Sequence, residues 1–240
     1  MLGRPFQNSV VALLDWDGTV SPGYSVIRWS EYLADRRLLD DRDLARLRQV
    51  FVDYEQGSMS YNDLAATSAA VYADSMRGLH LNEAEAAAHE FVQSDAQRLY
   101  KFSPWLFQYL REHDVATLVI SGAPDIVLNE YSRRYSLDGT CGLQLRRDKA
   151  DRFDGMVEKN PGVLEVKEAT IDTWCRGASI AAAFGNTVAD LPLLTRACLG
   201  VVINGLVSDF SPDIRQKLVF CAPEDVEEVV RLNYPPNRRI

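Results

Sequence analysis

The sequence has 240 residues, of which 47% are hydrophobic and 25% are charged, and these values are ordinary for a soluble globular protein. This length accommodates one large domain, or a core domain with a smaller domain inserted into it. The net charge of -8 argues against binding to nucleic acid or to anionic membranes, but a metal ion and one lysine can still reverse the local field and bind an anionic substrate.

The first predicted element is a short buried strand, Val10–Leu14, which consists of five consecutive apolar residues. Asp15 and Asp17 follow it two positions apart, so the alternation of an extended chain points both carboxylates the same way. Gly18 allows a sharp turn just after them. Two like charges side by side are costly unless a positive charge or a shared proton lies between them. The pattern therefore favours either a cation with oxygen ligands or acid/base chemistry.

Residues 25–99 predict a helical block with no convincing strand, because apolar residues recur there at helical spacing. Ser60 is expected to cap one helix, with Asp63 at its third position. Residues 82–100 predict another helix, opened by Asn82.

Alternating strands and helices follow the helical block. This order implies a parallel sheet with helices on both faces, in which ligands bind beyond the carboxyl ends of the strands. Polar or small residues end three strands there, at Asp15, at Ser121 and at Gly185. The predicted strands are 115–120, a β-hairpin of 143–146 and 153–157, then 180–184, 199–203 and 218–221, and the predicted helices are 105–112, 123–135, 166–175, 191–197 and 223–230.

The spacing of the cysteines and the hydropathy of the chain indicate the cellular compartment. Four cysteines (141, 175, 198 and 221) are spaced as neither a zinc motif nor a disulfide framework. No apolar run reaches the length of a membrane-spanning helix. We therefore expect a reduced, cytoplasmic protein that binds neither membranes nor nucleic acid.

Four motifs in order resemble the haloacid dehalogenase superfamily of phosphatases, and together they cover nearly the whole chain. The helical block after the first motif and the hairpin before the lysine further resemble the phosphoserine-phosphatase-like subgroup. This resemblance implies a Rossmann-like, doubly wound parallel sheet (residues 1–20 and 101–240) with an inserted helical cap (residues 21–100). The four motifs are Asp15-Trp16-Asp17-Gly18-Thr19, Ser121-Gly122, Lys167, and the run from Gly185-Asn186 through Asp190 to Leu194.

The resemblance also implies a magnesium-dependent phosphomonoesterase. Asp15 is the expected nucleophile, which forms an aspartyl-phosphate, and Asp17 the general acid and base. Lys167 is expected to neutralise charge at the nucleophile, with Lys159 and Lys149 as competing candidates in the sequence. The remaining expectations concern ligands: Ser121, Gly122 and Thr19 for the phosphate, and Asp15, Asp17, Asn186 and Asp190 for Mg²⁺.

Two departures from the subgroup bear on metal and substrate. Asn186 stands where the subgroup usually has an aspartate, which predicts weaker metal binding because one negative charge is missing. Tyr24 stands near the position of a substrate-binding glutamate, and the stretch that follows Met59, residues 61–68, contains no arginine at the place where the subgroup has one in the cap. We therefore expect a small phosphorylated metabolite other than phosphoserine. Several cap aromatics either line its pocket or pack between helices: Tyr24, Trp29, Tyr54, Tyr61 and Tyr72.

Other functions remain open from the sequence. A phosphoryl-transfer mutase would use the same residues, and a binding or regulatory protein that has lost activity would keep the same fold. A dehalogenase is disfavoured because that branch lacks the second acid, which is present here as Asp17.

Overall fold

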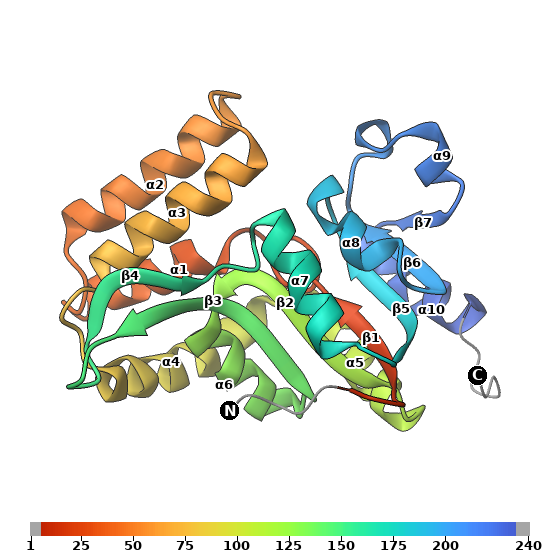
Figure 1. The fold of residues 1–240 in the computed structure, drawn as a ribbon, viewed down its shortest axis with the longest axis horizontal. Helices are drawn as coiled ribbons and strands as arrows, with labels where there is room; N and C mark the ends of the chain where they lie inside the picture. Colours follow the sequence, from red (N-terminus) through yellow and green to blue (C-terminus); the bar gives the residue numbers. More distant parts are fainter. Residues whose placement is uncertain (1–5, 234–240) are drawn as a thin grey trace.

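The computed structural model describes residues 6–233, and its centre is a seven-stranded sheet of order β4-β3-β2-β1-β5-β6-β7 (Figure 1). All neighbouring strands are parallel except β3 and β4, which form the predicted antiparallel hairpin. The expected α/β fold is thereby confirmed. The strands are β1 Val10–Leu14, β2 Ala116–Pro124, β3 Gly139–Arg147, β4 Phe153–Lys159, β5 Ser179–Gly185, β6 Leu199–Ile203 and β7 Leu218–Cys221.

The apolar run of β1 forms the middle of the sheet because both of its faces are buried. Ala12 and Leu14 belong to one apolar cluster, which continues into the helices between β1 and β2. Val11 and Leu13 belong to a second cluster on the opposite face, which includes Ile171 of α7 (Leu164–Trp174). The alternation of side chains along one strand thus distributes its apolar residues between two helical layers.

Five helices lie between β1 and β2, and the cap of the fold is formed within this insertion (Figure 1). Ser60 and Asp63 form the predicted capping box at the start of α3. Helix α4 differs from the expectation, because it begins one residue earlier with His80 as its N-cap and gives way to a short 3-10 turn at Ala96–Arg98. The five helices are α1 Ser25–Asp35, α2 Asp41–Glu55, α3 Tyr61–Ser75, α4 Leu81–Asp95 and α5 Phe102–Glu112.

The helices predicted for the remaining chain are present with altered bounds, and α9 (Pro212–Arg215) is a further short helix that the sequence pattern does not predict. The helix predicted at 123–135 begins at Asp125, because β2 continues to Pro124. Helix α8 has a single turn, Leu191–Leu194, because the chain turns back to enter β6 at Leu199. In place of the helix predicted at 223–230, a 3-10 turn at Pro223–Asp225 precedes helix α10 (Val226–Asn233), which extends three residues beyond the predicted end. Helix α6 spans Asp125–Tyr135.

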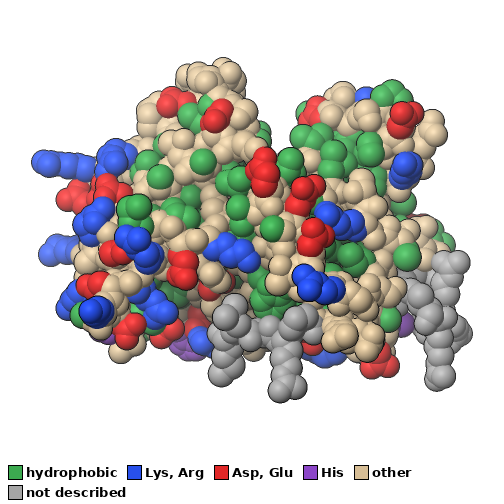
Figure 2. All heavy atoms as spheres, viewed as in Figure 1, with side chains coloured by type: hydrophobic (Ala, Val, Ile, Leu, Met, Phe, Trp, Pro, Cys, Tyr) green, Lys and Arg blue, Asp and Glu red, His purple; other side chains and the backbone are tan. Residues whose placement is uncertain are grey.

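The surface in this view is hollowed between the lobe of α2 and α3 and the lobe of α8 and α9 (Figure 2). Within residues 6–233, no helix combines the length and the apolar character that crossing a bilayer requires.

Candidate active site

The end of β1 places two carboxylates in one cavity. Asp15 and Asp17 both line it, and only 6% of Asp15 is exposed to solvent. Trp16, between them, is fully buried on the other side, with its ring centroid 4.6 Å from that of Tyr131. The chain therefore keeps its alternation past the last residue of the strand, as the spacing of the two acids predicts.

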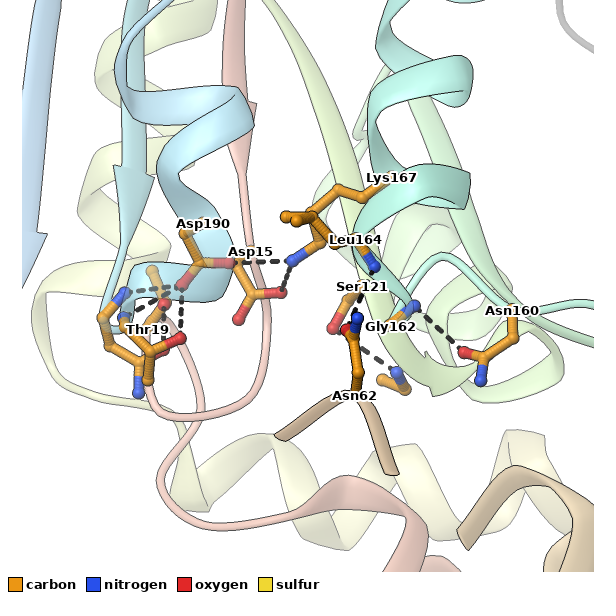
Figure 3. Close-up of polar contacts among 12 residues, drawn as sticks. Asp15, Thr19, Asn62, Ser121, Asn160, Gly162, Leu164, Lys167 and Asp190 are labelled. Carbon is orange, nitrogen blue, oxygen red and sulfur yellow. Dashed lines mark hydrogen bonds and ion pairs between the residues drawn. The ribbon is translucent and has the colours of Figure 1, made fainter. Parts of the chain in front are cut away.

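Lys167, near the start of α7, reaches one of these two acids, Asp15, and also Asp190 (Figure 3). Its Nζ atom lies 3.2 Å from Oδ1 of Asp15 and 2.7 Å from Oδ1 of Asp190, and the residue is fully buried. Lys159 lies on β4 and Lys149 in the hairpin turn, and within the described chain neither pairs with these carboxylates. The geometry thus brings Lys167, and not its two competitors, to Asp15.

Asp190 is the second carboxylate that contacts the lysine. Its Oδ2 atom accepts hydrogen bonds from the backbone N–H groups of Asn186, at 2.9 Å, and Thr187, at 3.1 Å. Gly185 is needed at the end of β5, because a Cβ there would lie 2.4 Å from the Cβ of Asp190. Both oxygens of Asp190 are therefore engaged within the chain, and its role as a metal ligand stays a prediction.

Burial and neighbouring charges together shift the pKa values of Asp15, Asp17 and Lys167. It raises the pKa of Asp15 to about 7, against the attraction of Lys167, and it raises the pKa of Asp17 to about 6. The pKa of Lys167 is also raised, because the carboxylates of Asp15 and Asp190 outweigh the burial that disfavours its charge. The lysine therefore stays charged, and the carboxyl groups of Asp15 and Asp17 each have a pKa close to neutrality.

Ser121 and Gly122 lie near the end of β2, before α6, and both line the cavity. Gly122 faces the backbone of Gly162, and a Cβ on Gly122 would lie 3.2 Å from the Cα of that residue. Thr19 is placed differently. Its hydroxyl is fully buried and donates to Oδ1 of Asn186 at 3.4 Å, and it does not line the cavity. Phosphate binding by Thr19 stays a prediction.

The oxygen atoms around Asp15 suit a hard divalent cation such as Mg²⁺. Lys167 contacts only Oδ1 of Asp15, which is the one oxygen of this carboxylate that has a hydrogen bond within residues 6–233. The amide of Asn186 lies beside Gly18 and lines the same cavity. The described residues hold no cluster of three His, Cys, Asp or Glu side chains arranged for a metal, so an amide or a backbone carbonyl would have to complete the protein ligands beside a carboxylate.

The profile of the haloacid dehalogenase-like hydrolases matches residues 12–195 of the chain. The chain belongs to this family.

Solved structures share the fold of this hydrolase at low sequence identity. A Bordetella pertussis Tohama I protein of unknown function has a TM-score of 0.69 at 17% identity, over 89% of this chain and 99% of that chain. A substrate-bound phosphoserine phosphatase has a TM-score of 0.62 at 13% identity, over 94% and 99%. A phosphoserine phosphohydrolase-like protein from Francisella tularensis has a TM-score of 0.60 at 14% identity, over 93% and 99%. A search of curated protein sequences finds no match.

Two contacts near the cavity of this hydrolase involve residues outside the four sequence motifs. Ser25, at the start of α1, donates its backbone N–H to Oδ1 of Asp17 at 2.9 Å, and its hydroxyl donates to the same oxygen. Asn160 connects the hairpin to the cap, because its Nδ2 donates to the carbonyl of Ala65 on α3 at 2.8 Å and its Oδ1 accepts from the N–H of Gly162 (Figure 3). The run Asn160-Pro161-Gly162 carries a turn signal that could have located the second contact.

The five cap aromatics of the hydrolase divide into two groups. Tyr24, Tyr54 and Tyr61 line the cavity. Trp29 and Tyr72 are buried in the apolar cluster, where the indole N–H of Trp29 donates to the Tyr72 hydroxyl at 2.9 Å. Both interpretations of these residues therefore apply, each to part of the set.

Proposed function

We propose that this hydrolase is a magnesium-dependent phosphomonoesterase that acts on a small phosphorylated metabolite other than phosphoserine. The observation that carries the proposal is the contact between the buried ammonium of Lys167 and Oδ1 of Asp15 at 3.2 Å, beside a cavity that Asp17 also lines. A carboxylate nucleophile, a proton donor and a fixed positive charge are the groups that phosphoryl transfer through an aspartyl-phosphate requires.

In the first half-reaction a carboxylate oxygen of Asp15 attacks phosphorus, and the bond from phosphorus to the leaving oxygen breaks. Asp17, in its acid form, donates a proton to that oxygen, so an alcohol departs. Its pKa of about 6 suits this role, because a proton donor works best when its pKa lies near the working pH. Lys167 offsets negative charge beside the nucleophile throughout.

In the second half-reaction Asp17, now a carboxylate, removes a proton from water as the water oxygen attacks phosphorus. The bond from phosphorus to the Asp15 oxygen then breaks, which releases phosphate and restores the nucleophile. The contacts from Ser25 orient the Asp17 carboxylate for both proton transfers. Ser121 and the backbone of Gly122 bind phosphate oxygens opposite Asp15.

Asp15, the backbone carbonyl of Asp17 and the Asn186 amide are the ligands we propose for Mg²⁺, which when bound supplies positive charge to the phosphate oxygens. Asp190 would affect this site indirectly, because its carboxylate positions Lys167. We also propose that residues 21–100 form the cap domain over a core of residues 1–20 and 101–240. A cytoplasmic location is consistent with four free cysteines.

The test is hydrolysis of p-nitrophenyl phosphate by the wild type and by Asp15→Asn, each with and without Mg²⁺. We expect magnesium-dependent release of phosphate by the wild type and none by the variant. Asp213→Asn makes the same chemical change at an exposed position and is expected to keep full activity. Absence of wild-type activity with any divalent metal, in a folded protein, would overturn the proposal in favour of a binding or regulatory role.

A further inference from the structure

The cavity has two kinds of wall. Its floor carries the carboxylates of Asp15 and Asp17, and these are the only charged side chains among the described residues that line it. The wall that the cap provides is apolar and aromatic. Its principal members are Tyr24, Phe51, Tyr54, Tyr61, Leu64 and Ser68.

The aromatic residues of this wall are packed in two pairs. The ring centroids of Tyr24 and Phe51 are 4.4 Å apart, and those of Tyr54 and Tyr61 are 6.3 Å apart in an edge-to-face arrangement. Burial raises the pKa of both Tyr24 and Tyr61, so their hydroxyls stay protonated and neutral at physiological pH. The wall therefore offers ring faces and neutral hydroxyl groups to whatever lies above the phosphate.

Two arginines of the cap that line a neighbouring groove pair with acidic side chains outside the cavity. Arg28 lies 2.9 Å from Asp95 and also donates to the backbone carbonyl of Pro22. Arg48 lies 2.6 Å from Glu31. Both arginines line a separate surface groove that Tyr24 and Phe51 divide from the cavity. A carboxylate on a substrate would therefore find no guanidinium partner in the cavity.

We propose that the leaving group of the substrate is an uncharged alcohol with an apolar or aromatic face, which packs against this wall. The inference rests on the proposed phosphomonoesterase function and names its substrate class. A carboxylate or a primary ammonium packed against the rings would lose its hydration without gaining an ionic partner in the wall, since the only charged side chains that line the cavity lie on its floor, and such burial is strongly unfavourable. An alkyl or benzyl group would instead gain by burying its apolar surface there.

The test compares four phosphate esters of primary alcohols at saturating Mg²⁺, with phosphate release as the readout. Propyl phosphate and O-phosphoserine share a three-carbon chain and differ in the amino and carboxylate groups, and benzyl phosphate and phosphocholine complete the set. We expect kcat/KM for propyl and benzyl phosphate to exceed that for phosphoserine by about tenfold or more. Equal or better use of phosphoserine would overturn the inference. So would a preference for phosphocholine, because the rings would then bind a cation.

A variant of Tyr54 is expected to shift the substrate preference toward phosphoserine. Tyr54 is half-buried, so Tyr54→Arg can place a guanidinium in the wall, and we expect it to raise kcat/KM for phosphoserine relative to propyl phosphate. Tyr54→Phe retains the ring and should keep the wild-type ranking of substrates. If Tyr54→Arg fails to fold, the kcat/KM values of the wild type for the four esters still test the inference. Hydrolysis of p-nitrophenyl phosphate without hydrolysis of propyl or benzyl phosphate would overturn the inference alone, whereas absence of activity toward p-nitrophenyl phosphate and all four esters would overturn the proposed function itself.

Discussion

Replacing Lys167 with methionine removes the one ammonium that separates two buried carboxylates. Its Nζ lies 3.2 Å from Asp15 and 2.7 Å from Asp190, and the side chain has no exposure to solvent. Removing one partner from a buried ion pair costs about 3 to 5 kcal/mol. Since a domain has a total stability of about 5 to 15 kcal/mol, we expect Lys167→Met to fold with a Tm lowered by about 10 °C.

The loss of stability in Lys167→Met is expected to depend on pH. Burial already raises the pKa of Asp15 to about 7, and loss of the ammonium raises it further. A carboxyl group whose pKa is higher in the folded state than in the unfolded state contributes stability at low pH, and this stability is lost as the pH rises through the folded pKa. In the presence of a chelator, the deficit of Lys167→Met should therefore be smaller at about pH 5 than at about pH 8.

Urea unfolding at the two pH values measures the deficit, and phosphate release from p-nitrophenyl phosphate measures activity, which should fall about 100-fold or more. Lys159→Met is the matched control, because that lysine lies on β4 outside the cluster, and it should change stability by less than about 1 kcal/mol. The argument would be refuted if Lys167→Met kept wild-type stability at both pH values, or if Lys159→Met caused the larger loss of activity.

Three further predictions concern the metal, the β5 turn and the thiols. Asn186→Asp should lower the Mg²⁺ concentration for half-maximal activity, because it adds a negative charge among the proposed ligands; an unchanged titration would remove Asn186 from the metal site. Gly185→Ala should lower kcat by up to about 100-fold, because its Cβ would lie 2.4 Å from the Cβ of Asp190 and displace it; a wild-type kcat would contradict this. At about pH 8, a maleimide followed by intact-mass spectrometry should label the exposed Cys198 and leave Cys141, whose thiol pKa burial raises to about 12, unlabelled until the protein unfolds. Labelling of both thiols at equal rates in the folded protein would contradict the burial of Cys141.

The sequence predicts those features of the fold and site that depend on local pattern. The apolar run of β1 and the spacing of Asp15 and Asp17 are local, and the structure places both carboxylates in one cavity. The capping box of Ser60 and Asp63 is also local, since it needs only residues three positions apart. The strand and helix order then fixes which strand ends meet.

The features that the sequence does not predict depend on tertiary contacts. Only the docking of α1 shows that Ser25 holds Asp17, and only the close approach of two glycine backbones brings Gly162 to Gly122. Tyr72 and Tyr61 lie on the same helix and are chemically alike, yet one packs in the core and the other faces the cavity. Helical spacing identifies a face of α3 but not what that face meets.

The apolar cluster that contains Ala12 and Leu14 of the central strand also contains Trp29, Leu47 and Leu64 of the inserted helices. The insertion consequently has no separate interior, although in the sequence it is a single block between two strands. Recombination that exchanged this block for the corresponding block of a relative would leave the upper layer of the sheet facing side chains of the wrong volume. Divergence of the cap in this lineage is therefore tied to compensating changes beneath it, and new specificity is more readily gained by substituting residues of the cavity wall than by replacing the whole block.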